Sequence, residues 1–107
     1  MSLKIIMTKT AKEDLRNISF YIYDQTKNLK TARAFINELL DKCKTLEEFP
    51  KRGTLSEDRF LLSLGFRFLA HKEYLIFYYY KAEENSVFIT SILNSKRDYA
   101  RIFKRLL

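Results

Sequence analysis

Apolar residues change their spacing once along this chain, close to residue 64. Before that point they recur every three or four positions, which is the period of an amphipathic helix. After it, aromatic and β-branched residues fill short runs that are separated by polar turns, which is typical of β-strands. This order predicts an α+β domain whose helices precede most of its strands.

The first half of the chain predicts one short strand and two helices. Residues 3–7 are strand-like, and a helix is expected over residues 11–26 because Thr10 opens a capping-box pattern ahead of helical apolar spacing. Thr31 is expected to cap a second helix, which ends before Pro50 because a residue that precedes proline disfavours the helical region. Since the connection is short, the two helices should pair as an antiparallel hairpin.

The second half predicts an antiparallel meander that follows a loop at residues 54–62. Its three strands are expected at residues 66–70, 74–81 and 86–93, with the second strand in the middle because it is apolar at almost every position. Residues 95–107 combine basic residues with apolar ones at helical spacing, which predicts a short C-terminal helix. The expected order is β-α-α-β-β-β, with the helical hairpin packed on one face of an antiparallel sheet.

Length and charge narrow the class of partner. The 107 residues fit one domain, 1–107, and 47% of them are hydrophobic, which is enough to form a core. Twenty Lys and Arg residues against 13 acidic ones give a net charge of +7, which favours nucleic acid, an anionic membrane or an acidic protein as partner. No apolar run approaches the roughly 20 residues of a membrane helix, and no signal peptide opens the chain. We therefore expect a cytoplasmic protein with no membrane partner.

Residues with nucleophilic or metal-binding chemistry are sparse. The single cysteine, Cys43, falls on the apolar stripe of the second helix, so it is expected to be a buried small hydrophobe. The single histidine, His71, is a candidate acid or base, but its place in a predicted turn favours a solvated residue. One histidine and one cysteine cannot build a zinc site, so no metal and no cofactor are expected.

Arginine side chains are the strongest candidates for binding. Arg67 begins the strand after the loop and Arg97 follows the last strand, so both can face one concave side of a meander and grip phosphate or carboxylate. The alternative is a pair of solvated strand-end charges. The basic tail adds further candidate contacts for phosphate or for an acidic protein: Lys96, Arg101, Lys104 and Arg105. A set of tyrosines forms either a base-stacking platform or core and interface aromatics: Tyr21, Tyr23, Tyr78, Tyr79 and Tyr80.

Four stretches resemble, in the same order, the RelE/ParE superfamily of bacterial type II toxins, also called plasmid-stabilisation proteins. They are Thr-Ala-Lys-Glu-Asp-Leu at 10–15, the apolar pattern of the second helix through Pro50 and Gly53, the segments Arg-Phe-Leu and Tyr-Leu-Ile-Phe-Tyr-Tyr at 67–69 and 74–79, and Ile-Leu-Asn-Ser-Lys-Arg-Asp at 92–98. The resemblance covers almost the whole chain. It implies a curved antiparallel sheet and a toxin that a cognate antitoxin neutralises.

The resemblance leaves the target open between two branches. RelE-like toxins cleave messenger RNA on the ribosome, whereas ParE-like toxins poison DNA gyrase and are not nucleases. Where an arginine and a tyrosine are usual in the nucleases, this sequence has Leu75 and Phe103, and only Arg97 keeps its place. These departures favour the ParE branch and a role that is not enzymatic. If the chain is a nuclease, Arg67 and Arg97 would stabilise the phosphate and His71 or a tyrosine would carry the proton.

The expected partners also follow from the resemblance. The antitoxin is expected to be small, acidic and partly disordered, and to fold on the toxin surface. The target is DNA gyrase or the ribosome, and promoter DNA is reached through the antitoxin complex. A third alternative is a family member that is not toxic and acts only within that complex.

Overall fold

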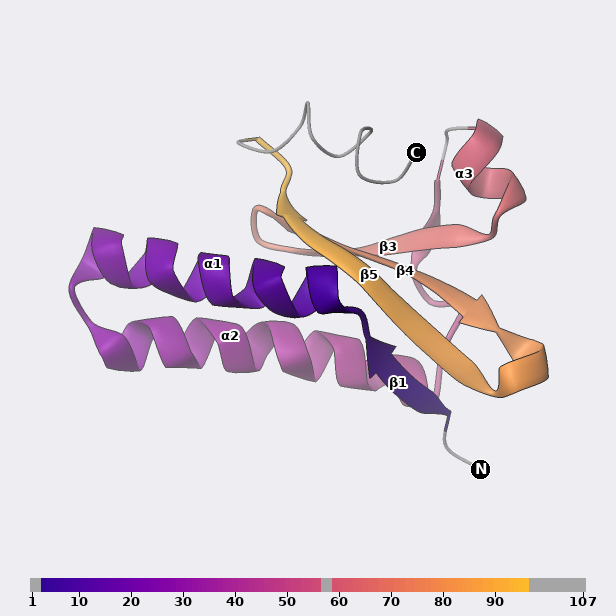
Figure 1. Ribbon diagram of the computed structural model, residues 1–107, viewed down its shortest axis with the longest axis horizontal. Helices are drawn as coiled ribbons and strands as arrows, with labels where there is room; N and C mark the ends of the chain where they lie inside the picture. The colour runs from indigo at the N-terminus through magenta and orange to yellow at the C-terminus, as the bar shows by residue number, and fades with distance from the viewer. Residues whose placement is uncertain (1–2, 57–58, 97–107) are drawn as a thin grey trace.

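Two long helices and a five-stranded sheet form the two layers of the protein (Figure 1). The computed structural model describes residues 3–56 and 59–96. In chain order the elements are β1 (Lys4–Met7), α1 (Lys9–Thr26), α2 (Leu29–Lys44), the 3-10 turn η1 (Thr45–Glu47), β2 (Thr54–Leu55), α3 (Arg59–Ser63), β3 (Phe66–His71), β4 (Tyr74–Lys81), the 3-10 turn η2 (Ala82–Glu84) and β5 (Ser86–Asn94). The predicted α+β class and order of the long elements are confirmed. The expected C-terminal helix lies outside the described residues.

The two long helices form the predicted hairpin, but each begins earlier than the sequence pattern suggested. Thr8 caps α1, because its extended backbone leaves β1 and its hydroxyl accepts a 3.2 Å hydrogen bond from the N–H of Ala11. Asn28 caps α2 in the same way, with its side-chain oxygen 3.1 Å from the N–H of Thr31. The predictions of Thr10 and Thr31 as caps are therefore wrong by two and three residues, since strand and helices follow one another with almost no loop.

The sheet is mixed, with the strand order β1-β5-β4-β3-β2. The meander β3-β4-β5 is antiparallel and has the predicted strands almost to the residue. The first strand, β1, differs from the expectation because it pairs with β5 in parallel. Parallel neighbours need a long crossover connection, and here the helical hairpin and the intervening strands supply it. The predicted loop at residues 54–62 contains β2, which pairs with β3, and the start of α3.

The helical hairpin covers one face of the sheet and β4 forms its centre. Side chains alternate along a strand, so Tyr74, Ile76 and Tyr78 belong to the core under the helices. Phe77, between them, packs instead with Leu93 on the opposite face. The expected middle position of this strand is confirmed, and four of its side chains are buried.

The edge of β5 beyond β1 is covered by the start of α1. The register slips where β4 passes from Phe77 to Tyr78, which leaves Thr90 as an extra residue in a bulge. The hydroxyl of Thr8 donates to the carbonyl of Thr90 at 3.1 Å, and the buried carboxylate of Asp14 accepts the N–H of Ile92 at 2.9 Å. Side chains of α1 thus replace the strand that would otherwise pair with this edge.

Candidate functional site

The half-buried side chain of Arg67 is committed to the chain's own backbone. Its Nη1 donates to the carbonyl oxygens of Lys51 at 3.0 Å and Gly53 at 2.9 Å. Arg67 lies opposite Tyr78 in the register, so both side chains are on the helix-covered side of the sheet. The guanidinium therefore holds the turn that follows α2. Arg97 lies outside the described residues, so the proposed pairing of the two arginines stays a prediction.

The same turn is held by Tyr78 from beneath. The hydroxyl of Tyr78, which is 0% exposed, accepts a 2.8 Å hydrogen bond from the N–H of Gly53. A Cβ atom on Gly53 would lie 2.5 Å from that hydroxyl and 2.9 Å from the carbonyl oxygen of Phe68, so only glycine fits this approach. Burial raises the pKa of Tyr78, although its bond to Gly53 and the charge of Arg67 act in the opposite direction. The protonated hydroxyl and the guanidinium together define the path of residues 50–53.

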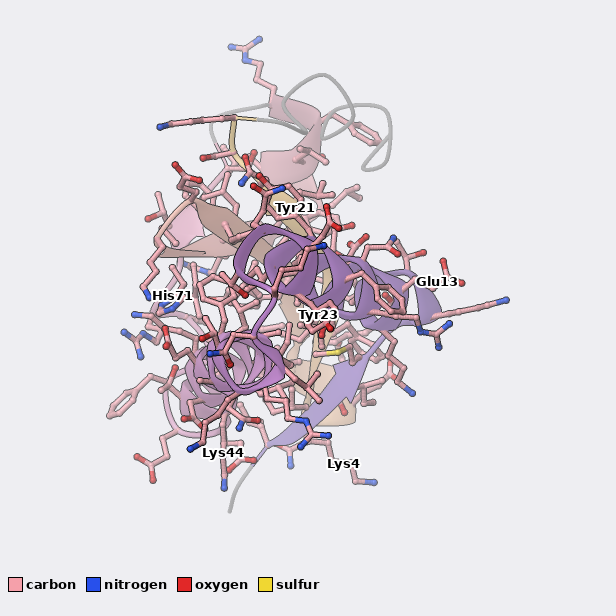
Figure 2. The ribbon with its side chains drawn as sticks, turned by 90° about the vertical axis from the view of Figure 1, so that its left-hand side faces the viewer. Lys4, Glu13, Tyr21, Tyr23, Lys44 and His71 are labelled. Carbon is pink, nitrogen blue, oxygen red and sulfur yellow. The ribbon has the colours of Figure 1, made fainter. Side chains whose placement is uncertain are left out.

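His71 ends β3 and does not behave as a free turn residue. Its Nε2 lies 2.7 Å from the Oε1 of Glu38 on α2, where the carboxylate is the acceptor, and its ring packs 5.6 Å from that of Phe35. Lys72 approaches the same carboxylate at 3.2 Å and lies over the Phe35 ring. The prediction of a solvated His71 is wrong, because α2 reaches over the β3–β4 turn. In Figure 2, His71 lies on the opposite side of the helical hairpin from Glu13.

Glu38, the acidic partner of His71, has a shifted pKa. The hydrogen bonds from His71 and then Lys72 lower the pKa of Glu38 below its ordinary value. The cluster therefore ties α2 to the β3–β4 turn. Within residues 3–56 and 59–96, no group of three or more His, Cys, Asp and Glu side chains could hold a metal ion.

The face of the sheet away from the helices is apolar around Leu75. Leu75 lies on this face and packs with Phe77 and Leu93. Further along, Phe66 meets the edge of Tyr79, and Tyr79 stacks on Phe88 with ring centroids 5.1 Å apart. Two groups of described side chains pack on this face, and both are aromatic or aliphatic. The first contains Leu75, Phe77 and Leu93, and the second contains Phe66, Tyr79 and Phe88. Neither group includes a histidine or an arginine.

The candidate tyrosines do not form one platform. Tyr78 is buried under the helices, whereas its neighbour Tyr79 is on the other face with one ring side against Phe88. Tyr21 and Tyr23 are exposed on α1, where Tyr21 lines a small cleft beside the β3–β4 turn. The reading of these residues as core and interface aromatics fits the structure better than a shared stacking surface.

A groove between the two long helices was missed by sequence reasoning. It has a volume of about 360 Å³ and is lined by Leu15, Arg16, Ser19, Phe20, Arg33, Ile36 and Asn37. In the described part of the chain, neither Arg16 nor Arg33 has an ion-pair partner. The antiparallel hairpin brings the two arginines together from different helices, which spacing along one helix does not reveal.

Most of the basic tail lies outside the described residues, namely Arg101, Lys104 and Arg105 as well as Arg97. Lys96 is described, and its exposed Nζ lies 3.3 Å from the Oε1 of Glu73. An exposed pair of this kind contributes little to stability, so Lys96 remains available for a partner. None of the helices in the described ranges has the length and hydropathy that a membrane crossing requires.

Comparisons with known proteins place this fold and sequence in a family. The model of the family described as "ParE toxin of type II toxin-antitoxin system, parDE" matches residues 5–99. The chain therefore belongs to the ParE toxin family, within the RelE/ParE superfamily of type II toxin–antitoxin toxins. A search of curated proteins finds no match.

Solved structures with the same fold include toxins of both branches. A chain of the chromosomal ParDE system from P. aeruginosa superposes with a TM-score of 0.71 at 18% identity, over 87% of this chain and 96% of that one. A chain of the toxin–antitoxin complex RelBE2 from Mycobacterium tuberculosis gives 0.64 at 18% identity, over 88% and 92%. A mutant of the E. coli toxin RelE in the free state gives 0.63 at 16% identity, over the whole of both chains. At such identities the likeness shows the fold alone.

Proposed function

We propose that this toxin acts as its ParE-branch sequence features suggest, by binding and poisoning DNA gyrase and not by cleaving RNA. The observation that carries the proposal is Leu75, an aliphatic residue on the sheet face where a RelE-like nuclease would have an arginine. Cleavage of RNA needs a base, an acid and a cation at the phosphate. Leu75 can supply none of these, and its neighbours Phe77 and Leu93 cannot either.

Two further candidates for nuclease chemistry, Arg67 and His71, are held by other groups of the chain, and the third, Arg97, lies outside the described residues. One guanidinium nitrogen of Arg67 donates to two backbone carbonyls, and His71 is hydrogen-bonded to Glu38 on α2. Neither lies on the apolar face that includes Leu75, since alternate residues of β3 point to the helix side. A binding mechanism requires no such constellation.

The test is a supercoiling assay with purified gyrase, run beside a cleavage assay on ribosome-bound message. We expect the purified toxin to inhibit supercoiling and to leave the message intact. The Leu75→Arg variant serves as a control that restores the cation without adding an acid or a base. Cleavage of the message by the unaltered toxin, with gyrase untouched, would assign the chain to the ribonuclease branch. If expression does not slow bacterial growth at all, this result supports the alternative that the chain is a non-toxic family member.

A cognate antitoxin is the second element of the proposed function. The groove between α1 and α2 suits an amphipathic helix, because its lining combines apolar side chains with two arginines that have no ion-pair partner among the described residues. An acidic antitoxin helix would place apolar residues against Phe20 and Ile36 and carboxylates near Arg16 and Arg33. The charge-reversed variant Arg16→Glu/Arg33→Glu should remain toxic but escape neutralisation. Full neutralisation of that variant would move the antitoxin to another surface.

A further inference from the structure

The turn that follows α2 presents an exposed aromatic ring between charged residues. Phe49 is 63% exposed, more than any other large apolar side chain in the described ranges except Phe20, and Lys51 and Arg52 nearby are exposed as well. Residues 48–52 surround a surface hollow of about 450 Å³. We call residues 49–53 the Phe49 turn. A single exposed apolar side chain is ordinary by itself; what sets Phe49 apart is the firmly held backbone and the two cations beside it.

Five hydrogen bonds fix the backbone of the Phe49 turn. The N–H of Phe49 donates to the carbonyl of Thr45, and the N–H of Arg52 donates to the carbonyl of Phe49, both at 3.2 Å. At the other end the turn is held by the Tyr78 hydroxyl and by the two bonds from Arg67. A segment that is already ordered before binding loses less conformational entropy on association. The turn is therefore preorganised to present its side chains.

The charge of the Phe49 turn defines the partner. In residues 3–56 and 59–96, neither Lys51 nor Arg52 forms an ion pair. Two acidic residues, Glu47 and Glu48, lie directly before the turn. Two cations around an aromatic ring suit a protein surface with carboxylates around an apolar pocket. A nucleic acid would need a larger set of cations and no carboxylate in the midst of them.

We propose that the Phe49 turn is the contact through which this toxin grips an acidic, apolar pocket on its protein target. Phe49 is the anchor, and Lys51 and Arg52 pair with carboxylates at the pocket's rim. Arg67 is a positioning residue, because it reaches the target only through the backbone of the turn that it holds. The inference rests on the proposed function, in which the toxin acts by binding. The turn lies beyond the end of α2, whereas the antitoxin groove lies along the middle of the helices.

The experiment compares four purified proteins for gyrase binding, gyrase inhibition and toxicity in cells. They are the unaltered toxin, Phe49→Ala, Arg67→Lys, and Phe60→Ala as a matched control with an exposed phenylalanine on α3. We expect Phe49→Ala to weaken target binding on the order of ten- to a hundredfold, as anchor residues do, and Phe60→Ala to leave it unchanged. Neutralisation by the antitoxin, through the groove between α1 and α2, should be the same for all four proteins.

Hydrogen exchange separates the anchor from the positioning residue. Arg67→Lys should speed exchange of the Arg52 and Gly53 amides and weaken target binding, because the lysine side chain is shorter and its ammonium group is more strongly hydrated than a guanidinium. Phe49→Ala should weaken binding with no change in exchange. A charge test completes the set: Lys51→Glu/Arg52→Glu should lose binding, and Lys9→Glu/Lys12→Glu on α1, with the same change in net charge, should keep it.

The outcomes for the two proposals are distinct. If the unaltered toxin inhibits gyrase and Phe49→Ala inhibits it equally well, the Phe49 turn is not the contact, and the proposed function still holds. If the unaltered toxin does not bind or inhibit gyrase, the proposed function fails. The toxicity of the variants in cells then tests whether the Phe49 turn contacts a different target. If Phe49→Ala loses toxicity and Phe60→Ala keeps it, the Phe49 turn is supported as the contact with another protein target. Equal toxicity of the two variants, or a Phe49-dependent affinity for a single-stranded oligonucleotide alone, overturns the inference.

Discussion

The N–H of Gly53 donates a 2.8 Å hydrogen bond to the hydroxyl of Tyr78, which lies 25 residues later in the chain and at the centre of the sheet. This bond joins the surface turn after α2 to the core beneath the helices. It explains why a tyrosine, and not a phenylalanine, occupies a fully buried position of β4. It also places a structural group directly under the surface that we propose for target binding.

Removal of that hydroxyl should therefore loosen the turn. In Tyr78→Phe the buried N–H of Gly53 loses its acceptor, which costs about 1–3 kcal/mol in the free energy of unfolding. Urea denaturation measures this loss, and hydrogen exchange should become faster at Gly53. As a control, Tyr80→Phe changes a tyrosine two residues along the same strand that is only partly buried. Equal stability of Tyr78→Phe and the unaltered protein would show that the bond adds nothing.

The buried carboxylate of Asp14 predicts a second stability effect. Asp14 is 4% exposed and accepts the N–H of Ile92 where β5 has no neighbouring strand. Asp14→Ala should lower the free energy of unfolding by about 1.5–3 kcal/mol, because a bond to a charged group is lost and a buried donor is left over. Thermal unfolding measures the change. The neighbouring exposed residue gives the control Glu13→Ala, and a similar small effect of both variants would contradict the role of Asp14.

Glu38 predicts a dependence of stability on acid. Its pKa is lowered in the folded protein by His71 and Lys72, so the folded state binds the proton less readily than the unfolded chain does. The contribution is present above the ordinary value of 4.5 and is lost as the pH falls through the lower folded value. The difference in Tm between the unaltered protein and Glu38→Gln should therefore shrink as the pH falls from above 4.5 through the lower folded value. Asp41→Asn, which changes an exposed carboxylate on the same helix that has no ion-pair partner among the described residues, is the control.

Cys43 should be chemically inert in the folded protein. It is 3% exposed, and burial raises its pKa from 9.0 to about 12. Because the thiolate is the reactive form, alkylation at about pH 8 should be slow in buffer and fast in urea. The raised pKa also predicts that stability falls as the pH rises from 9.0 towards about 12, since the unfolded chain loses the proton first. Rapid alkylation of the native protein would contradict the buried position.

The period of the apolar residues was sufficient to predict the long elements, since 66–70, 74–81 and 86–93 match three observed strands closely. It could not predict β2 and α3, because two and five residues are too few to show a period. The period of the apolar residues also could not predict that β1 pairs in parallel, since the alternation of side chains within one strand carries no information on the direction of the neighbouring strand.

The binding residues were predicted less well, for a physical reason. Arg67 was predicted to bind the phosphate or carboxylate of a partner, whereas the acceptors that the structure shows are backbone carbonyls of a turn 14 and 16 residues earlier. His71 was misjudged because its partner, Glu38, is 33 residues away on α2. A signal for the Phe49 turn was present in the sequence, namely an aromatic residue between a helix end and two cations. Without its hydrogen bonds, that pattern could not be told from an ordinary loop.

Expression of the toxin in growing bacteria, with pulses of labelled thymidine and labelled leucine, tests the gyrase-binding mechanism most directly. Poisoned gyrase stops replication, so we expect thymidine incorporation to fall first while leucine incorporation continues. Messenger RNA should remain full-length during this interval. An early fall of leucine incorporation with fragmented message, while thymidine incorporation persists, would contradict the mechanism and assign the toxin to the ribosome.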